Sequence, residues 1–125
     1  MSKIVIIEDS SYMRRMIRGI LNADGYEIVE ADEGLKGLQM VKTVTPDCVL
    51  VDLIMPGIDG LKVLNVLHAE MPDVPVIVLT ADIQESVREQ CLKLGASGFI
   101  NKPPKEDVLR DTVKNILGSR RKTGQ

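Results

Sequence analysis

The chain has 125 residues, with 16 Lys and Arg against 18 Asp and Glu, which gives a net charge of −2. This length allows one domain that buries its own core, and the charge balance excludes a protein that coats nucleic acid or an anionic membrane. Two Tyr, one Phe and no Trp are too few for stacking on single-stranded nucleic acid. The longest apolar runs have four residues, which excludes a membrane-spanning helix, and two cysteines without a ligand pattern favour a reducing, cytoplasmic setting.

The first part of the chain predicts a strand, a helix, a second strand and a second helix. The unbroken β-branched run 4–7 is typical of a parallel strand that is buried on both faces. Ser10 can cap the amphipathic helix that follows, and Gly25 stands in a helix-stop position. Segment 26–31 contains two glutamates and predicts an edge strand, after which Asp32 can cap the second helix.

The same alternation continues to the end of the chain. The apolar runs 48–51 and 76–79 predict two more buried strands, and the short segment 98–100 predicts a second edge strand. Apolar residues at helical spacing predict helices over about 61–70, 87–94 and 108–117. We expect residues 119–125 to form a polar, basic tail that frays from a domain spanning 1–118.

Five strands alternating with five helices predict an α/β fold. The crossovers of such a chain are right-handed, so the sheet is parallel and doubly wound, with helices on both faces. The three most apolar strands belong inside the sheet, and the strand order 2-1-3-4-5 of flavodoxin-like folds satisfies this condition. The functional crevice then lies at the carboxyl ends of the first and third strands.

Polar side chains stand just after four of the predicted strands. They are Glu8 and Asp9 after the first strand, Asp52 after the third, Thr80 after the fourth and Lys102 after the fifth. Three carboxylates and one ammonium group leave a charge of −2, which one divalent cation neutralises, and a set of oxygen ligands favours Mg²⁺. Mg²⁺ commonly binds phosphate as well, so the central acid, Asp52, is the natural nucleophile for an aspartyl phosphate. Thr80 and Lys102 can donate to the phosphoryl oxygens.

Each of these residues also has an ordinary structural interpretation. Acidic residues favour helix starts, Asp52 stands beside a Pro- and Gly-rich turn, Thr80 can cap a helix and Lys102 can be solvated. Their convergence on one edge of the sheet favours a site instead. Three arginines on the first predicted helix are interpreted as a solvated face. They are Arg14, Arg15 and Arg18.

Over residues 3–117 the sequence resembles the receiver domains of two-component response regulators, especially the single-domain chemotaxis type. The matching motifs are Ile7-Glu8-Asp9, the loop 51–60, Leu79-Thr80-Ala81, Gly95-Ala96 and Lys102-Pro103. Each motif alone is weak, whereas their order and spacing together are specific.

The resemblance implies a phosphorylation-activated switch rather than an enzyme with a separate substrate. A histidine kinase or a histidine phosphotransfer protein would phosphorylate Asp52, and Mg²⁺ would be held by Glu8, Asp9, Asp52 and the backbone carbonyl of Ile54. Transfer and hydrolysis would be catalysed by the domain itself. Ile54 and Asp82 would tune the lifetime of the phosphoryl group, because a polar side chain there can orient a water.

The resemblance also implies how the signal leaves the domain. Thr80 and Phe99 would rearrange on phosphorylation, which alters the face made by the fourth helix, the fifth strand and the fifth helix, where a downstream protein binds. It further implies a cis peptide bond before Pro103. Ser97 and Gly98 replace the acidic pair of family members that dimerise through this face, so we expect a monomer with no direct nucleic-acid or membrane contact.

Other interpretations compete with a stand-alone receiver domain. The chain could be a receiver segment of a larger multidomain regulator. It could also be a Mg²⁺-dependent phosphatase of the haloacid-dehalogenase type, although such enzymes carry a second Asp where this sequence has Ile54. A flavodoxin-like flavin binder shares the strand order, but Glu8 and Asp9 would repel the flavin phosphate.

Overall fold

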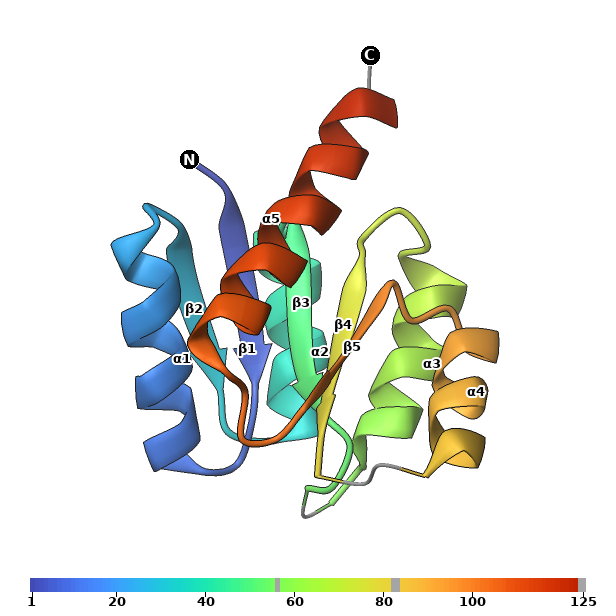
Figure 1. The fold of residues 1–125 in the computed structure, drawn as a ribbon. Helices are drawn as coiled ribbons and strands as arrows, with labels where there is room; N and C mark the ends of the chain where they lie inside the picture. Colours follow the sequence, from blue (N-terminus) through green and yellow to red (C-terminus); the bar gives the residue numbers. More distant parts are fainter. Residues whose placement is uncertain (56, 82–83, 124–125) are drawn as a thin grey trace.

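The computed structural model describes residues 1–55, 57–81 and 84–123. Within these residues five strands alternate with five helices, and the strands form one parallel sheet in the order β2-β1-β3-β4-β5 (Figure 1). The strands are β1 Lys3–Ile7, β2 Glu27–Ala31, β3 Cys48–Asp52, β4 Val76–Thr80 and β5 Gly98–Asn101. The helices are α1 Ser11–Ala23, α2 Gly34–Val44, α3 Gly60–Glu70, α4 Glu85–Lys93 and α5 Glu106–Thr123. The predicted doubly wound fold and strand order are confirmed.

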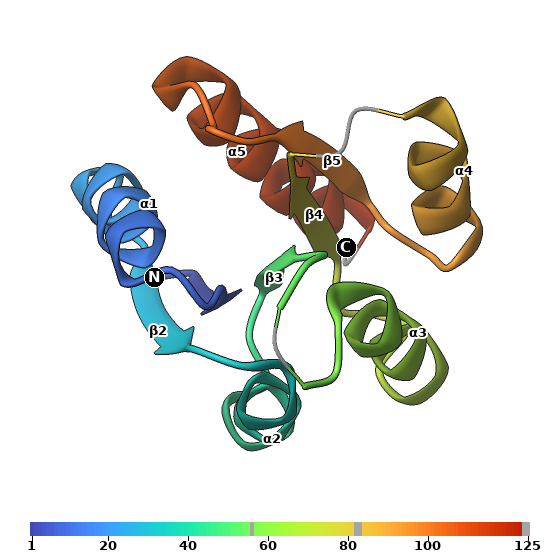
Figure 2. The same ribbon diagram turned by 90° about the horizontal axis from the view of Figure 1, so that it is seen from below.

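The sheet separates two apolar cores. Successive strand residues point to opposite faces, so Val5 and Ile7 of β1 pack into the core beneath α2, α3 and α4, while Ile4 and Ile6 pack into the core beneath α1 and α5. Figure 2 shows α1 and α5 on one side of the sheet and α2 and α3 on the other. Every residue of β3 and β4 is buried, whereas β2 and β5 are partly exposed. The predicted inner and edge strands are therefore confirmed.

The boundaries of α1 follow the predicted signals. The Ser10 side chain accepts a hydrogen bond from the Met13 backbone N–H at 3.2 Å, which satisfies one of the free donors in the first turn. Gly25, with φ of 88°, follows the end of the helix and allows the left-handed turn into β2.

The predicted cap of α2 is wrong. Asp32 does not cap the helix but pairs with Lys36, whose Nζ lies 3.3 Å from Asp32 Oδ1. The N-cap residue is Glu33, which makes no side-chain capping bond. The helix begins at Gly34, where a Cβ would lie 2.7 Å from Ile58 Cγ1, so the start of this helix packs closely against the β3–α3 loop.

Helix α5 runs on to Thr123, beyond the predicted end at Leu117. The backbone of the expected tail is therefore helical through residue 123, farther than the apolar pattern predicts. Arg and Lys are good helix formers, and their charges are favourable near the C-terminal end of a helix. The apolar pattern ends at Leu117 because that is where the helix leaves the core, not where it ends.

The carboxyl ends of the strands meet at the lower edge of the sheet in Figure 1, and the N-terminus lies at the opposite edge. The loops that leave β1, β3, β4 and β5 all start from this lower edge. No helix in the described part of the chain is both long and apolar enough to cross a membrane.

Candidate functional site

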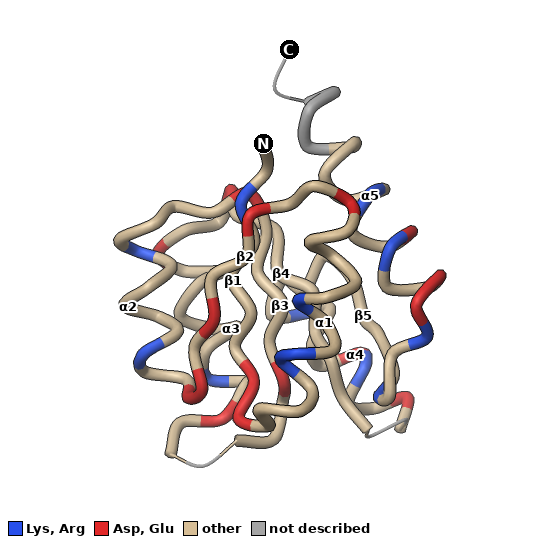
Figure 3. The backbone as a smooth tube through the Cα atoms, turned by 90° about the vertical axis from the view of Figure 1, so that its left-hand side faces the viewer, with Lys and Arg blue, Asp and Glu red and all other residues tan. Residues whose placement is uncertain are grey.

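Three carboxylates meet where β1 and β3 end. The two strands pair in parallel with Ile7 opposite Val51, so the residues that follow them lie side by side. Carboxylate oxygens of Glu8, Asp9 and Asp52 lie within 4.8 Å of one another. Glu8 and Asp52 are buried and Asp9 is exposed. Figure 3 shows acidic positions gathered at this lower edge of the molecule.

Lys102 joins this cluster from the loop that follows β5. Its Nζ lies 3.0 Å from Asp52 Oδ2 and forms an ion pair with Glu8 Oε1. Its backbone N–H donates to the Thr80 carbonyl at 2.8 Å, which ties the loop to the end of β4. The peptide bond between Lys102 and Pro103 is cis, as the family resemblance implied.

Glu8 has the least favourable surroundings in the cluster. The Ser10 backbone N–H donates to Oε2 at 3.3 Å, while Oε1 faces Lys102 without the alignment of a hydrogen bond. Burial raises the pKa of Glu8 from 4.5 to about 7; Lys102 opposes this shift, and Asp52 and Asp9 add to it. A buried carboxylate that shares one ammonium group with Asp52 fits a site for a hard cation.

Lys102 stays positively charged despite its burial. Burial alone would lower the pKa of its ammonium group, but the carboxylates of Glu8 and Asp52 outweigh burial, so the pKa of Lys102 is raised. Among the described residues, one ammonium group thus faces a cluster of three carboxyl groups.

The other predicted site residues surround Asp52. The Ile54 backbone N–H donates to Asp52 Oδ1 at 3.3 Å, while the Ile54 side chain is 71% exposed. Thr80 is fully buried at the end of β4, one residue beyond the register partner of Asp52. Phe99 is half-buried on β5 and packs into the core beneath α4. Asp82 lies outside the described residues.

Comparison with known proteins settles the family. Residues 4–114 match the family described as response regulator receiver domain. This chain is a member of that family. The receiver domain therefore belongs to two-component signalling, and the haloacid-dehalogenase alternative is set aside.

Relatives that match along nearly their whole length are single receiver-sized proteins. The chemotaxis protein CheY of Listeria monocytogenes is 37% identical over 91% of this chain and 97% of its own length. The sporulation initiation phosphotransferase F of Bacillus subtilis is 33% identical over 92% of this chain and 93% of its own. A solved CheY-like receiver domain from Methanospirillum hungatei has a TM-score of 0.94, covers 98% of both chains and, at 24% identity, bears on the fold alone.

Other relatives are longer proteins. This receiver domain spans 57% of a Pseudomonas aeruginosa relative that is 38% identical. It spans 31% of a cyclic di-GMP phosphodiesterase of Thermotoga maritima that is 32% identical.

One residue near the cluster was misinterpreted from the sequence. Arg14 does not belong to a solvated face: its Nη1 donates to the Glu8 carbonyl at 2.7 Å, and its Nε lies 3.3 Å from Glu30 Oε1. Arg14 thereby holds the end of β1 against β2. Helical periodicity could not reveal this contact, because the partner acid, Glu30, belongs to β2 and not to the helix.

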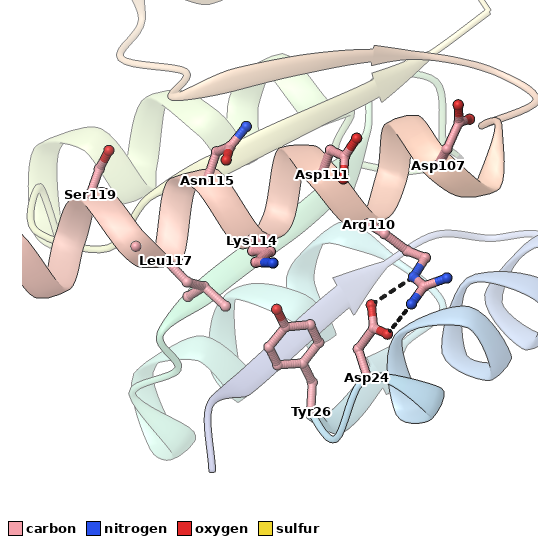
Figure 4. Close-up of a pocket in the computed structure, with 10 residues that line it drawn as sticks. Asp24, Tyr26, Asp107, Arg110, Asp111, Lys114, Asn115, Leu117 and Ser119 are labelled. Carbon is pink, nitrogen blue, oxygen red and sulfur yellow. Dashed lines mark hydrogen bonds and ion pairs between the residues drawn. The ribbon is translucent and has the colours of Figure 1, made fainter.

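A pocket of about 930 Å³ lies elsewhere, between α5 and the turn from α1 to β2 (Figure 4). Arg110 crosses it to Asp24, with Nε 3.0 Å from Oδ2 and Nη2 2.7 Å from Oδ1. Tyr26 lines its floor. None of the predicted site residues lines this pocket, so the candidate site is the acidic cluster.

Proposed function

We propose that this receiver domain accepts a phosphoryl group on Asp52 and transmits a signal through a changed protein surface. The surroundings of the Asp52 carboxylate carry this proposal. The side chain is 6% exposed; one oxygen accepts from Lys102 Nζ at 3.0 Å and the other from the Ile54 N–H at 3.3 Å. Two further carboxylates lie within 4.8 Å.

The transfer is a substitution at phosphorus. An Asp52 carboxylate oxygen attacks the phosphorus of a phosphohistidine on a histidine kinase or histidine phosphotransfer protein. The new O–P bond forms as the N–P bond breaks, and the electron pair stays on the imidazole nitrogen. The Lys102 ammonium group and the Thr80 hydroxyl donate to the phosphoryl oxygens, which stabilises their charge during transfer.

The acidic cluster is suited to hold Mg²⁺. Glu8, Asp9, Asp52 and the backbone carbonyl of Ile54 would provide oxygen ligands, which this ion prefers. When bound, Mg²⁺ supplies positive charge that offsets the carboxylates and the incoming phosphoryl oxygens. The raised pKa of Glu8 supports this assignment, because a nearby cation would stabilise the ionised form.

The signal passes from Asp52 to the side of the sheet that carries β5. Val78 of β4 pairs with Phe99 of β5, and Thr80 points to the same face as Val78, two residues along the strand. A phosphoryl group that draws the Thr80 hydroxyl inward leaves room for the Phe99 ring to become more buried. A downstream protein would then bind the face made by α4, β5 and α5, where apolar Leu92 and Val108 are exposed.

A phosphorylation experiment tests the acceptor. We expect the protein to be a cytoplasmic monomer. Acetyl phosphate with Mg²⁺ should add one phosphoryl group to the wild type, and a chelator should prevent the addition. Asp52→Asn should remain folded and take no phosphoryl group, while Asp32→Asn, which changes an exposed acid outside the cluster, should react like the wild type. Peptide mass spectrometry that places the phosphoryl group on another residue would overturn the proposal.

A further inference from the structure

Gly60, the first residue of α3, lies directly against the backbone of Asp52. A Cβ at position 60 would lie 2.1 Å from the Asp52 carbonyl oxygen, 2.6 Å from Leu53 Cα and 2.8 Å from the Asp52 carbonyl carbon. These are backbone atoms, so they cannot rotate away as the end of a flexible side chain can. Position 60 therefore has no room for any side chain while Asp52 stays in place.

The reason for glycine here is steric rather than conformational. The glycines with positive φ among the described residues are Gly25, Gly57 and Gly95, so Gly60 has a backbone conformation open to other residues. Alanine is the better helix former at such a position. Local propensity thus favours replacing Gly60, and only the contact with Asp52 opposes it.

The start of α3 and the end of β3 are joined through the backbone. The Gly60 N–H donates to the Leu53 carbonyl at 2.9 Å. Asp59 caps the helix by accepting from the Lys62 N–H at 3.0 Å. A displacement of the first turn of α3 is therefore passed to the peptide between Asp52 and Leu53.

The strand itself cannot retreat from such a displacement. All five residues of β3 are buried, and the strand is paired with β1 and β4 on its two sides. The Leu53 N–H also donates to the Leu79 carbonyl at 3.2 Å. The shift must be absorbed at the end of the strand, where the Asp52 carboxylate faces Lys102 Nζ at 3.0 Å.

We infer that Gly60 is a positioning residue for phosphoryl acceptance: its lack of a side chain lets α3 hold the Asp52 carboxylate in line with Lys102. The inference rests on the proposed function of Asp52. A contact of 2.1 Å must open by about 1 Å to become tolerable, and misplacement of a reacting group by about 1 Å can slow a reaction by roughly 100-fold.

The test compares Gly60→Ala with two other glycine variants. Gly37→Ala is the matched control, because Gly37 is also a buried helical glycine, but its Cβ would meet side-chain atoms of Ile7 at 2.4 to 2.8 Å rather than backbone. Gly19→Ala adds a methyl group with nothing within 4 Å. For each variant we would measure the Tm, the Mg²⁺ Kd and the rate of phosphorylation by acetyl phosphate at saturating Mg²⁺.

Gly60→Ala should phosphorylate roughly 10- to 100-fold more slowly than the wild type even at saturating Mg²⁺. Gly37→Ala should lose thermal stability but keep the wild-type rate, and Gly19→Ala should change neither rate nor Mg²⁺ affinity. Amide resonances of Leu53 and Ile54 should shift in Gly60→Ala and not in Gly37→Ala, which reports the geometry without reference to phosphorylation.

Two results would overturn this inference but not the proposed function, provided that the wild type is phosphorylated. One is a folded Gly60→Ala that reacts at the wild-type rate, which would mean that α3 moves away instead. The other is an equal loss of rate in Gly37→Ala. If Gly60→Ala does not fold, Asp59→Ala is measured in its place, because it loosens the same helix start. A slowed rate of phosphorylation in Asp59→Ala supports the inference, and a wild-type rate overturns it. A wild type that accepts no phosphoryl group would instead overturn the proposed function.

Discussion

At the scale of single residues, burial rather than crowding sets the electrostatic cost of the acidic cluster. The carboxylate oxygens of Glu8, Asp9 and Asp52 lie within 4.8 Å of one another, yet the main cause of the raised pKa of Glu8 is its loss of contact with water. Each single contribution from the neighbouring acids to this shift in pKa is smaller than that of burial. When no cation is bound, the electrostatic cost of the site therefore falls mainly on Glu8, which is fully buried.

Glu8 should make the stability of the metal-free protein depend on pH. Its pKa is about 7 in the folded protein and 4.5 in the ordinary case, so between these values the folded state binds the proton more tightly than the unfolded chain. In the presence of a chelator, the free energy of unfolding should fall by up to about 3 kcal/mol from about pH 5 to about pH 8. Urea denaturation at the two pH values measures this slope.

Two variants test whether Glu8 causes this pH dependence of the free energy of unfolding. Glu8→Gln should remove most of it and should be more stable than the wild type at about pH 8. Asp9→Asn, which changes an exposed acid of the same cluster, should keep most of it. An undiminished slope in Glu8→Gln would contradict this explanation.

Ile54 should lengthen the life of the phosphoryl group. Its N–H donates to Asp52 Oδ1, which places this residue next to the reacting carboxylate, and its exposed aliphatic side chain offers no group that can orient a water. Ile54→Asn should shorten the lifetime of the acyl phosphate by roughly tenfold, measured by the decay of phosphorylated protein after the donor is removed. Leu92→Asn, at a similarly exposed apolar position on α4, should leave the lifetime unchanged. An equal or longer lifetime in Ile54→Asn would refute the argument.

At the scale of whole elements, α5 is held to the sheet by one apolar stripe. Leu109 is fully buried against the sheet, while its neighbour Val108 is 43% exposed. Leu109→Ala should lower the free energy of unfolding by about 2–5 kcal/mol, and Val108→Ala by less than about 0.5 kcal/mol. Equal losses in urea denaturation would show that α5 does not pack as described.

The strands could be predicted from the sequence more reliably than the ends of the helices. Runs such as 48–51 are apolar throughout because both faces of the strand are buried. Adjacent residues alone therefore predict the strand. Helix starts depend on distant neighbours as well. Asp32 has the chemistry of a cap, but the helix begins at Gly34, where it packs closely against Ile58 of a distant loop.

The acidic cluster could be predicted for a related reason. In a parallel sheet the residues after the strands must converge, so Glu8, Asp52 and Lys102 could be placed together once the strand order was known. The role of Arg14 could not, because its contact with Glu30 depends on how α1 lies over β2. The same holds for Gly60, whose contact with Asp52 depends on how closely α3 approaches β3.

At the scale of the whole molecule, the proposed switch connects Asp52 to β5 through Thr80. Phe99 is the single phenylalanine of the chain, so fluorophenylalanine labelling gives one fluorine resonance that reports on this ring. Phosphorylation should shift that resonance, with a bias between the two ring positions of about 1–3 kcal/mol.

The same label tests the route of the signal. Thr80→Ala should still accept phosphate but should lose most of the shift, because the hydroxyl that moves inward is gone. Asp52→Asn treated with acetyl phosphate should show no shift. A wild-type response in Thr80→Ala would rule out this route while leaving the phosphoacceptor assignment intact.

Burial of the inner strands on both faces also governs how such a protein diverges. Substitutions at positions 48–51 of β3 and 76–79 of β4 meet packed atoms on either side, so we expect only a narrow set of apolar residues to be tolerated there. The outward faces of the helices bear no such constraint. Substitutions on the helices can therefore change the docking partner while the reaction chemistry is inherited unaltered. After a gene duplication, the two copies can then come to serve separate signalling pathways without an inactive intermediate.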